Sequence, residues 1–322
     1  MLICREKPTV ISIVIPLFNE EDVFPHLKGA LEAICPKLEA QVEIILVDDG
    51  SSDSTFRQML EWARQSPSVK AIGLSRNFGH QTAVTAGLDA SRGDAVVIMD
   101  ADLQDPPELI SEFLRGYAQG YDVVYGHRLE REKESVMKRA TATAFYWVMK
   151  KFVDARLPSN VGDFRLMSRR VVDDLRKMNE RDRFIRGLVA WVGYDQLAVD
   201  YVRPGRVAGE TKYPMFKMVK FAVTAITTFS DAPLRLVLWC GMFSMGVAMA
   251  LIVRTLYLHF FGDTPLVQGW ASLTVIISFF SGLILLSIGA VGLYIGRIFS
   301  ESQGRPLYLV KHAINIQGNP FR

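Results

Sequence analysis

The stretch Val10–Pro16 (VISIVIP) is an almost unbroken run of apolar, mostly β-branched residues. Such a run is typical of a strand that is buried on both faces of a parallel sheet. Similar runs recur along the chain, with helical stretches between them. The expected strands are Val10–Pro16, Val42–Val47, Val69–Leu74 and Ala95–Met99, and the expected helices are Phe24–Leu38, Ser54–Arg64, Gln81–Ala90 and Pro107–Gly116. This alternation predicts an α/β fold, with a doubly wound and mostly parallel sheet.

Polar residues follow three of these strands, at the point where each strand ends. They are Asn19 and Glu20 after the first strand, Asp48 and Asp49 after the second, and Asp100 and Asp102 after the fourth. In open α/β sheets, ligands bind beyond the carboxyl ends of the strands. The sequence therefore predicts one binding site at this edge of the sheet.

The segment Asp100-Ala101-Asp102 offers two carboxylates one residue apart. Mg²⁺ and Mn²⁺ prefer oxygen ligands and often take only one or two from the protein. A cation held there would absorb the charge that a diphosphate gains as it leaves. A solvated turn is the alternative, because Asp and Pro are ordinary turn residues and Pro106 and Pro107 follow closely.

The other two strand ends suit a nucleoside. Asp48 and Asp49 can accept hydrogen bonds from a base N–H or a ribose hydroxyl, and Phe18 can lie against a base. Capping of the next helix by Ser51, Ser52 or Asp53 is an alternative that is compatible with ligand binding.

Two long apolar stretches lie late in the chain, Leu236–Val253 and Trp270–Gly296. Both are uncharged and long enough to cross a bilayer as helices, so we expect a transmembrane hairpin. Basic residues flank its two ends, whereas the connecting loop Leu258–Gly269 has neither Lys nor Arg. The positive-inside rule then puts both termini in the cytoplasm. The mixture of Lys and aromatic residues in Thr211–Phe229 is typical of a helix in the membrane interface.

Composition excludes other classes. The chain of 322 residues carries 37 basic and 34 acidic side chains, a balance that gives no reason to expect a nucleic-acid partner. The three cysteines have neither metal-ligand nor redox spacing, so a reducing compartment is expected.

The motifs together resemble a known family. VIPLFNEE, VDDGSSD and MDADLQDPPE, in this order, are similar to the inverting nucleotide-sugar glycosyltransferases of the A fold. Val161–Ser168 (VGDFRLMS), Arg206–Tyr213 (RVAGETKY) and Gly296–Ile298 further resemble the polyprenyl-phosphate glycosyltransferases. This group includes dolichol-phosphate mannose synthase and, closest in pattern, the bacterial bactoprenol glucosyltransferases. The resemblance extends over about residues 10–310.

The resemblance implies transfer of one sugar, with inversion, from a nucleotide-sugar to undecaprenyl phosphate at the cytoplasmic membrane of a bacterium, with Mg²⁺ or Mn²⁺. The implied donor-binding residues are Pro16, Phe18, Glu20, Asp48, Asp49, Asp100, Ala101, Asp102, Gln104, Arg206 and Lys212. The implied metal ligands are Asp102, Gln104 and Asp100, of which Asp102 is also catalytic. Arg206 and Lys212 have an alternative as interfacial cations beside anionic lipid.

The resemblance also implies an acceptor site and a base. Arg128, Lys138 and Arg139 are expected to hold the lipid phosphate; a solvated charge run is the alternative. Asp163 is the candidate catalytic base, and it could instead cap a helix or pair with Arg165. His80 has an ordinary loop or cap interpretation and receives no chemical role.

The expected organisation is a catalytic domain over residues 1–208, interfacial helices over 209–232, and two transmembrane helices within 233–298. The helices lie at about 234–257 and 270–296, and a cytoplasmic tail follows over 299–322. UDP-glucose is the preferred donor; a UDP-4-amino-arabinose derivative, UDP-N-acetylhexosamine and GDP-mannose are alternatives. A homo-oligomer, such as a tetramer, is expected. The chain lacks the Gln-x-x-Arg-Trp signature of processive synthases. From another class, a non-catalytic sugar-nucleotide sensor or scaffold remains a hypothesis.

Overall fold

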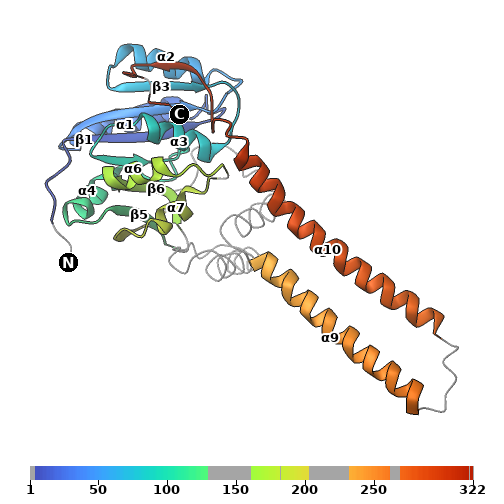
Figure 1. Ribbon diagram of the computed structural model, residues 1–322. Coiled ribbons are helices and arrows are strands. Elements are labelled where there is room, and N and C mark those ends of the chain that lie inside the picture. Colours follow the sequence, from blue (N-terminus) through green and yellow to red (C-terminus); the bar gives the residue numbers. More distant parts are fainter. Residues whose placement is uncertain are drawn as a thin grey trace. The chain divides into compact units, whose positions relative to one another are not determined.

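A computed structural model of the protein describes residues 4–129, 161–181, 183–202, 232–261, 269–318 and 320–321. The chain divides into two compact units. The first joins Met1–Tyr213 to Arg305–Arg322, and the second is Pro214–Gly304. The first unit contains an α/β sheet, and the second contains two long helices (Figure 1).

The sheet has eight strands in the order β7-β5-β6-β4-β1-β2-β3-β8. Their bounds are β1 Val10–Leu17, β2 Gln41–Asp48, β3 Val69–Leu74, β4 Ala95–Ile98, β5 Val123–Arg128, β6 Val161–Ser168, β7 Gln196–Tyr201 and β8 Val310–Ile314. β1 is parallel to β2 and β4, β2 is parallel to β3, and β5 is parallel to β7. β6 is antiparallel to β4 and β5, and β8 is antiparallel to β3. The predicted fold class, an α/β fold with a mostly parallel sheet, is confirmed.

Helices cover both faces of this sheet. They are α1 Phe24–Ile34, α2 Thr55–Gln65, α3 His80–Ala90, α4 Ile110–Ala118, α6 Arg169–Lys177 and α7 Ile185–Trp191. α1, α2 and α4 share one apolar cluster with Ile11, Ile13 and Ile15 of β1. On the other face, Gly87 of α3 lies directly against Val14. Alternate residues of β1 thus pack against opposite helical layers, which is why its sequence reads as one apolar run.

The four expected strands and four expected helices all form, with small shifts at their ends. The C-terminal part of Phe24–Leu38 is a 3₁₀ turn, Cys35–Lys37, and Pro107–Leu109 is a second 3₁₀ turn before α4. The strands β5, β6, β7 and β8 are not among those expected from the sequence. β6 inserts between β4 and β5 and is antiparallel to both, so β4 and β5, which are consecutive along the chain, do not pair.

The register of β6 matters for the site. β6 pairs Ala95 with Ser168 and Ile98 with Arg165. Continued by two residues, this antiparallel register sets Asp163 opposite Asp100. Since β4 and β5 both run antiparallel to β6, their carboxyl ends point to the same edge.

The C-terminal segment after the long helices returns to the sheet of the first unit. β8 pairs with β3 at the edge of the sheet (Figure 1). His312 of β8 stacks on Phe56 of α2 with ring centroids 5.3 Å apart. The Tyr308 hydroxyl donates to Asp89 Oδ2 at 2.7 Å, and Asn315 Nδ2 donates to the carbonyl oxygen of Val69 at 2.8 Å. Part of the predicted tail 299–322 is therefore an edge strand of the sheet.

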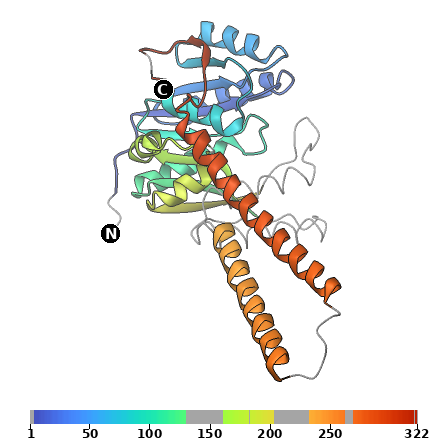
Figure 2. The same ribbon diagram turned by 45° about the vertical axis from the view of Figure 1, so that its right-hand side comes forward.

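The second unit consists of α9 (Ala232–Phe261) and α10 (Trp270–Ser302), which contact each other (Figures 1 and 2). Each predicted transmembrane stretch, 234–257 and 270–296, lies within one of these helices. Among the described residues, one helical stretch, Phe279–Ser302, is long and apolar enough to cross a membrane by length and composition. The two-span hairpin, its orientation and the domain boundaries remain predictions.

Tyr308→Phe is expected to destabilise the catalytic unit. The change removes the hydrogen bond from this hydroxyl to the buried Asp89 carboxylate, and a hydrogen bond to a charged group contributes about 1.5–3 kcal/mol. Equilibrium or thermal unfolding of the detergent-purified protein measures the loss. Tyr194→Phe is the matched control, because its hydroxyl donates to Asp174, which lies at the surface. Equal losses in both variants would contradict a specific role for the returning segment.

Candidate functional site

The loops after β1 and β2 lie side by side and are tied together. The β1–β2 register pairs Leu17 with Asp48 at the carboxyl end of both strands. Asn19 has a φ of 53°, its N–H donates to Ser51 Oγ at 2.9 Å, and its Oδ1 accepts from the Ser52 N–H at 2.9 Å. These hydrogen bonds join the two loops next to Phe18, which is 45% exposed and can therefore meet a planar ligand.

The two neighbouring aspartates after β2 are buried and already engaged. Asp48 accepts from the Ser51 N–H at 3.2 Å. Asp49 accepts from the Phe78 N–H at 2.7 Å and the Gly79 N–H at 2.9 Å, and so holds the loop that precedes α3. Burial raises the pKa of both carboxyls.

Gly50 permits this arrangement, because a Cβ there would lie 2.5 Å from the carbonyl carbon of Arg76. The two loops therefore approach each other more closely than any other residue type would allow.

The acidic loop after β4 forms a tight turn. The Gln104 N–H donates to Asp102 Oδ1 at 3.2 Å. Leu103 between them has a φ of 52°, a conformation that costs free energy for a residue with a Cβ and that clusters at ligand sites. Gln104 is buried, whereas Asp102 is half-buried. The turn holds the Asp102 carboxylate at the rim of the site.

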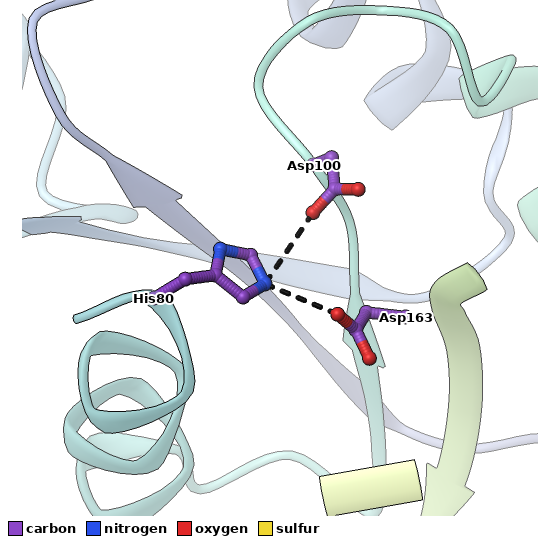
Figure 3. A group of neighbouring side chains, drawn as sticks. All are labelled: His80, Asp100 and Asp163. Carbon is purple, nitrogen blue, oxygen red and sulfur yellow. Dashed lines mark hydrogen bonds and ion pairs between the residues drawn. The ribbon is translucent and has the colours of Figure 1, made fainter. Parts of the chain in front are cut away.

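His80, Asp100 and Asp163 converge from α3, β4 and β6 (Figure 3). His80 Nε2 lies 3.2 Å from Asp163 Oδ2 and 3.7 Å from Asp100 Oδ1. Burial alone would lower the pKa of His80, but the hydrogen bond to Asp163 and the charge of Asp100 raise it above its ordinary value. Burial raises the pKa of Asp100 to about 6 despite the nearby His80.

Asp163 is held on both carboxylate oxygens. Arg186 donates from Nε to Oδ1 at 2.7 Å and from Nη2 to Oδ2 at 3.1 Å, and Gln81 Nε2 donates to Oδ2 at 3.2 Å. Burial would raise the pKa of Asp163, but the charge of Arg186 and the hydrogen bonds hold that pKa well below its ordinary value. The neighbouring Arg165 donates instead to the carbonyl oxygen of Gly162 at 2.9 Å.

Arg128 lies at the carboxyl end of β5 against a buried carboxylate. Its Nη2 donates to both oxygens of Asp105 at 3.2 Å, and its Nε donates to the Tyr201 hydroxyl at 3.0 Å. Tyr201 also donates to Asp105. A Cβ at Gly162 would lie 2.3 Å from Arg128 Nη2, so only glycine leaves room for the guanidinium.

The donor set suits a hard divalent cation. Asp100 Oδ1 is buried and has no hydrogen-bond partner among the described residues, an unfavourable state for a carboxylate oxygen. One ligand atom from each of His80, Asp100 and Asp163 lies within 4.8 Å of the others. Carboxylate oxygens suit Mg²⁺ or Mn²⁺, so this cluster could hold such a cation. Of the predicted metal ligands it includes Asp100, whereas Asp102 and Gln104 are not part of it.

The structure thus brings Asp100 and Asp163 of the predicted set together, with Asp102 two residues away. Arg128 is at the same edge, bonded to Asp105. Four of the predicted residues lie outside the described part of the chain: Lys138, Arg139, Arg206 and Lys212. The roles of the predicted site residues remain proposals.

Sequence reasoning missed His80, Gln81, Arg186, Asp105 and Tyr201. His80 and Gln81 could have been found from the sequence, because α3 directly follows β3 and therefore starts at the carboxyl edge of the sheet. The sequence gives no indication of the role of Arg186, since its position depends on how α7 packs.

Comparisons with known proteins identify the family of this chain. The model of the family "Glycosyl transferase family 2" matches residues 12–176. An uncharacterized glycosyltransferase of Bacillus subtilis (strain 168) is 45% identical over 306 residues, which is 95% of this chain and 94% of the relative. A bactoprenol glucosyl transferase of Shigella phage SfV is 39% identical over 306 residues, which is 94% of this chain and 98% of the relative.

Among solved structures, mannosyl-3-phosphoglycerate synthase from Rubrobacter xylanophilus aligns with a TM-score of 0.46 at 16% identity, over 68% of this chain and 72% of that one. The family match includes β1, the acidic loop after β4 and Asp163, and the sequence relatives extend over nearly the whole chain. The chain therefore belongs to glycosyl transferase family 2 and is a glycosyltransferase.

Proposed function

We propose that this glycosyltransferase moves one sugar, with inversion, from a nucleotide-sugar to a polyprenyl phosphate at the cytoplasmic face of a bacterial membrane. The observation that carries the proposal is the meeting of Asp100 and Asp163 at the carboxyl edge of the sheet, beside Asp102. The identity of 39% to a bactoprenol glucosyl transferase supports a polyprenyl-phosphate acceptor.

The donor would lie across the loops after β1, β2 and β4. Phe18 is exposed for stacking on the base, and Pro16, Glu20, Asp48 and Asp49 shape the loops around the nucleoside. Asp100, Asp102 and Gln104 would hold Mg²⁺ or Mn²⁺ against the diphosphate, with Ala101 between them. When bound, such a cation supplies charge stabilisation for the departing diphosphate. UDP-glucose is the proposed donor, in keeping with the glucosyl relatives.

Inversion needs a phosphate oxygen of the acceptor in line with the bond between the anomeric carbon and the nucleoside diphosphate. The oxygen–carbon bond forms as the bond to the diphosphate breaks, without a covalent enzyme intermediate. A lipid phosphate is already anionic, so it needs little help from a base. Because Arg186 lowers its pKa, Asp163 suits an orienting anion better than a strong proton acceptor.

The acceptor phosphate would approach Arg128, with Lys138 and Arg139 as further ligands. Arg128 stands at the carboxyl end of β5, where a guanidinium can share its donors between Asp105 and a phosphate. Arg206 and Lys212 are proposed to close on the donor diphosphate. The apolar stretch Phe279–Ser302 supports membrane attachment, and a two-helix hairpin with both termini in the cytoplasm is part of the proposal.

A non-catalytic sensor or scaffold is the competing hypothesis. It accounts for nucleotide binding but gives no reason for a fixed Asp163 carboxylate beside Asp100. Purified protein incubated with radiolabelled UDP-glucose, Mg²⁺ and undecaprenyl phosphate separates the two hypotheses. We expect label in the organic phase; no transfer from UDP-glucose or from the alternative UDP- and GDP-sugars would rule out the enzyme.

Asp102→Asn is expected to lower kcat at least about 100-fold, because the metal and diphosphate lose one anionic ligand. The fold should persist, since Asp102 is half-buried and an amide oxygen can still accept from the Gln104 N–H. Radiolabel transfer and the thermal midpoint are measured together. Asp173→Asn, at an exposed carboxylate on α6, is the control and should retain full activity. Full activity of Asp102→Asn would remove this residue from the metal site.

Gly162→Ala is expected to raise the KM for the lipid acceptor about tenfold, since the new methyl group displaces the Arg128 guanidinium and weakens a charge-assisted contact. The KM for the donor should be unchanged. Steady-state kinetics with each substrate varied in turn give both values. Gly29→Ala is the matched control, because its Cβ would meet nothing within 4 Å. An unchanged lipid KM in Gly162→Ala would argue against acceptor binding by Arg128.

A further inference from the structure

We infer that Arg186 and Gln81 are positioning residues that hold the Asp163 carboxylate in one orientation at the reaction centre. The inference rests on the proposed function, in which Asp163 faces the acceptor. Neither residue belongs to the motifs that carry the family resemblance. Both are identified by their contacts with Asp163.

Arg186 grips Asp163 at two points. Its Nε and Nη2 meet the two carboxylate oxygens separately, at 2.7 and 3.1 Å, which stops the carboxylate from rotating about its terminal bond. The remaining nitrogen, Nη1, donates to the carbonyl oxygen of Val161 at 3.0 Å. Arg186 is therefore fixed to the same strand, β6, that carries Asp163, and the pair moves as a unit.

Gln81 locks this unit to the rest of the site. Its Nε2 donates to Asp163 Oδ2 at 3.2 Å, and its Oε1 accepts from the Ile185 N–H at 2.9 Å. One amide thus connects the start of α3, the middle of the site and the start of α7. Since Ile185 directly precedes Arg186, Gln81 also fixes the backbone from which the guanidinium extends.

The local surroundings make this arrangement rigid. The Asp163 side chain is 6% exposed and that of Arg186 is 33% exposed, so solvent competes little for the carboxylate oxygens. His80 contacts the same Oδ2 atom and lies between Asp163 and Asp100. A carboxylate with this many donors has one orientation available, and such fixed geometry is what a group at a reaction centre requires.

A positioning role predicts a particular pattern of kinetic loss. Misplacement of a reacting group by about 1 Å costs on the order of 100-fold in rate. Arg186→Gln should therefore lower kcat about 100-fold, while the donor and lipid KM values change little, because the guanidinium is engaged with Asp163 and Val161. Arg186→Lys keeps the charge but loses the two-point grip, so it should recover only part of kcat.

Gln81→Ala tests the second contact independently and should lower kcat about tenfold with unchanged KM values. Arg176→Gln is the matched control, since Arg176 has a similar exposure of 28% and donates to the carbonyl oxygens of Leu88 and Ser91 away from the site. It should lower the thermal midpoint but leave the kcat of the folded enzyme within about twofold of the wild type.

The variants, assayed by radiolabel transfer with donor and lipid each varied, decide the inference. A kcat of Arg186→Gln and Gln81→Ala within threefold of the wild type would overturn it. A raised donor KM at unchanged kcat would also overturn it, because Arg186 would then bind the donor directly. Should Arg186→Gln not fold, Arg186→Lys and Gln81→Ala give the same two measurements.

Failure of the proposed function is recognised separately, as a wild-type protein that transfers no sugar from any donor. The contact between Asp163 and Arg186 can then still be tested by a double-mutant cycle that measures thermal stability. Asp163→Asn, Arg186→Gln and the double variant should shift the midpoint non-additively, because the two side chains share two direct hydrogen bonds that either single change disrupts. Additive shifts would contradict the pairing on which the inference depends.

Discussion

Backbone hydrogen bonding between β4 and β6 governs the site more than any side-chain contact. A purely parallel sheet would bring loops together at its carboxyl edge, but none of its strands would start at that edge. Because β6 is antiparallel to β4, it starts at that edge, and its Asp163 lies opposite Asp100, the first aspartate of the loop after β4. Because side chains alternate along a strand, a shift of one residue would turn Asp163 to the other face. The register of four backbone pairs thus determines whether two carboxylates meet.

The carboxylates at this edge differ in how their charge is compensated. Asp49 is neutralised by backbone N–H groups, Asp105 by a guanidinium and a phenol, and Asp163 by a guanidinium and an amide. Asp100 stands apart, because its buried Oδ1 accepts no hydrogen bond from the residues described and has His80 Nε2 at 3.7 Å as a more distant charge partner. A buried polar atom without a hydrogen bond is costly, so natural proteins keep such groups mainly where a ligand completes them. The contrast identifies Asp100 as the least compensated of these carboxylates.

Much of the fold and some of the site could be predicted from the sequence, and the division has physical causes. The β1 to β4 strands were predictable because burial on both faces leaves only apolar residues in Val10–Pro16 and its counterparts. Asp100 and Asp102 were predictable because they follow such a strand directly. β6 (VGDFRLMS) was not, because its two buried charged residues, Asp163 and Arg165, disguise a fully buried strand. Arg186 could not be found at all, since it depends on a tertiary contact over a long separation in sequence. The edge strand β8 was equally hidden, as its alternation is weak over Val310–Ile314.

The return of the chain to the sheet through β8 has a consequence for biosynthesis. A ribosome makes the chain from the N-terminus, and domains begin to fold as they emerge. All the other strands are complete once residue 201 has been made, but β8 becomes available only after both long helices have been synthesised. Until then the free edge of β3 presents unpaired backbone groups, the feature through which sheets aggregate. In the nascent protein, the edge of β3 therefore stays exposed for the time that translation of α9 and α10 takes.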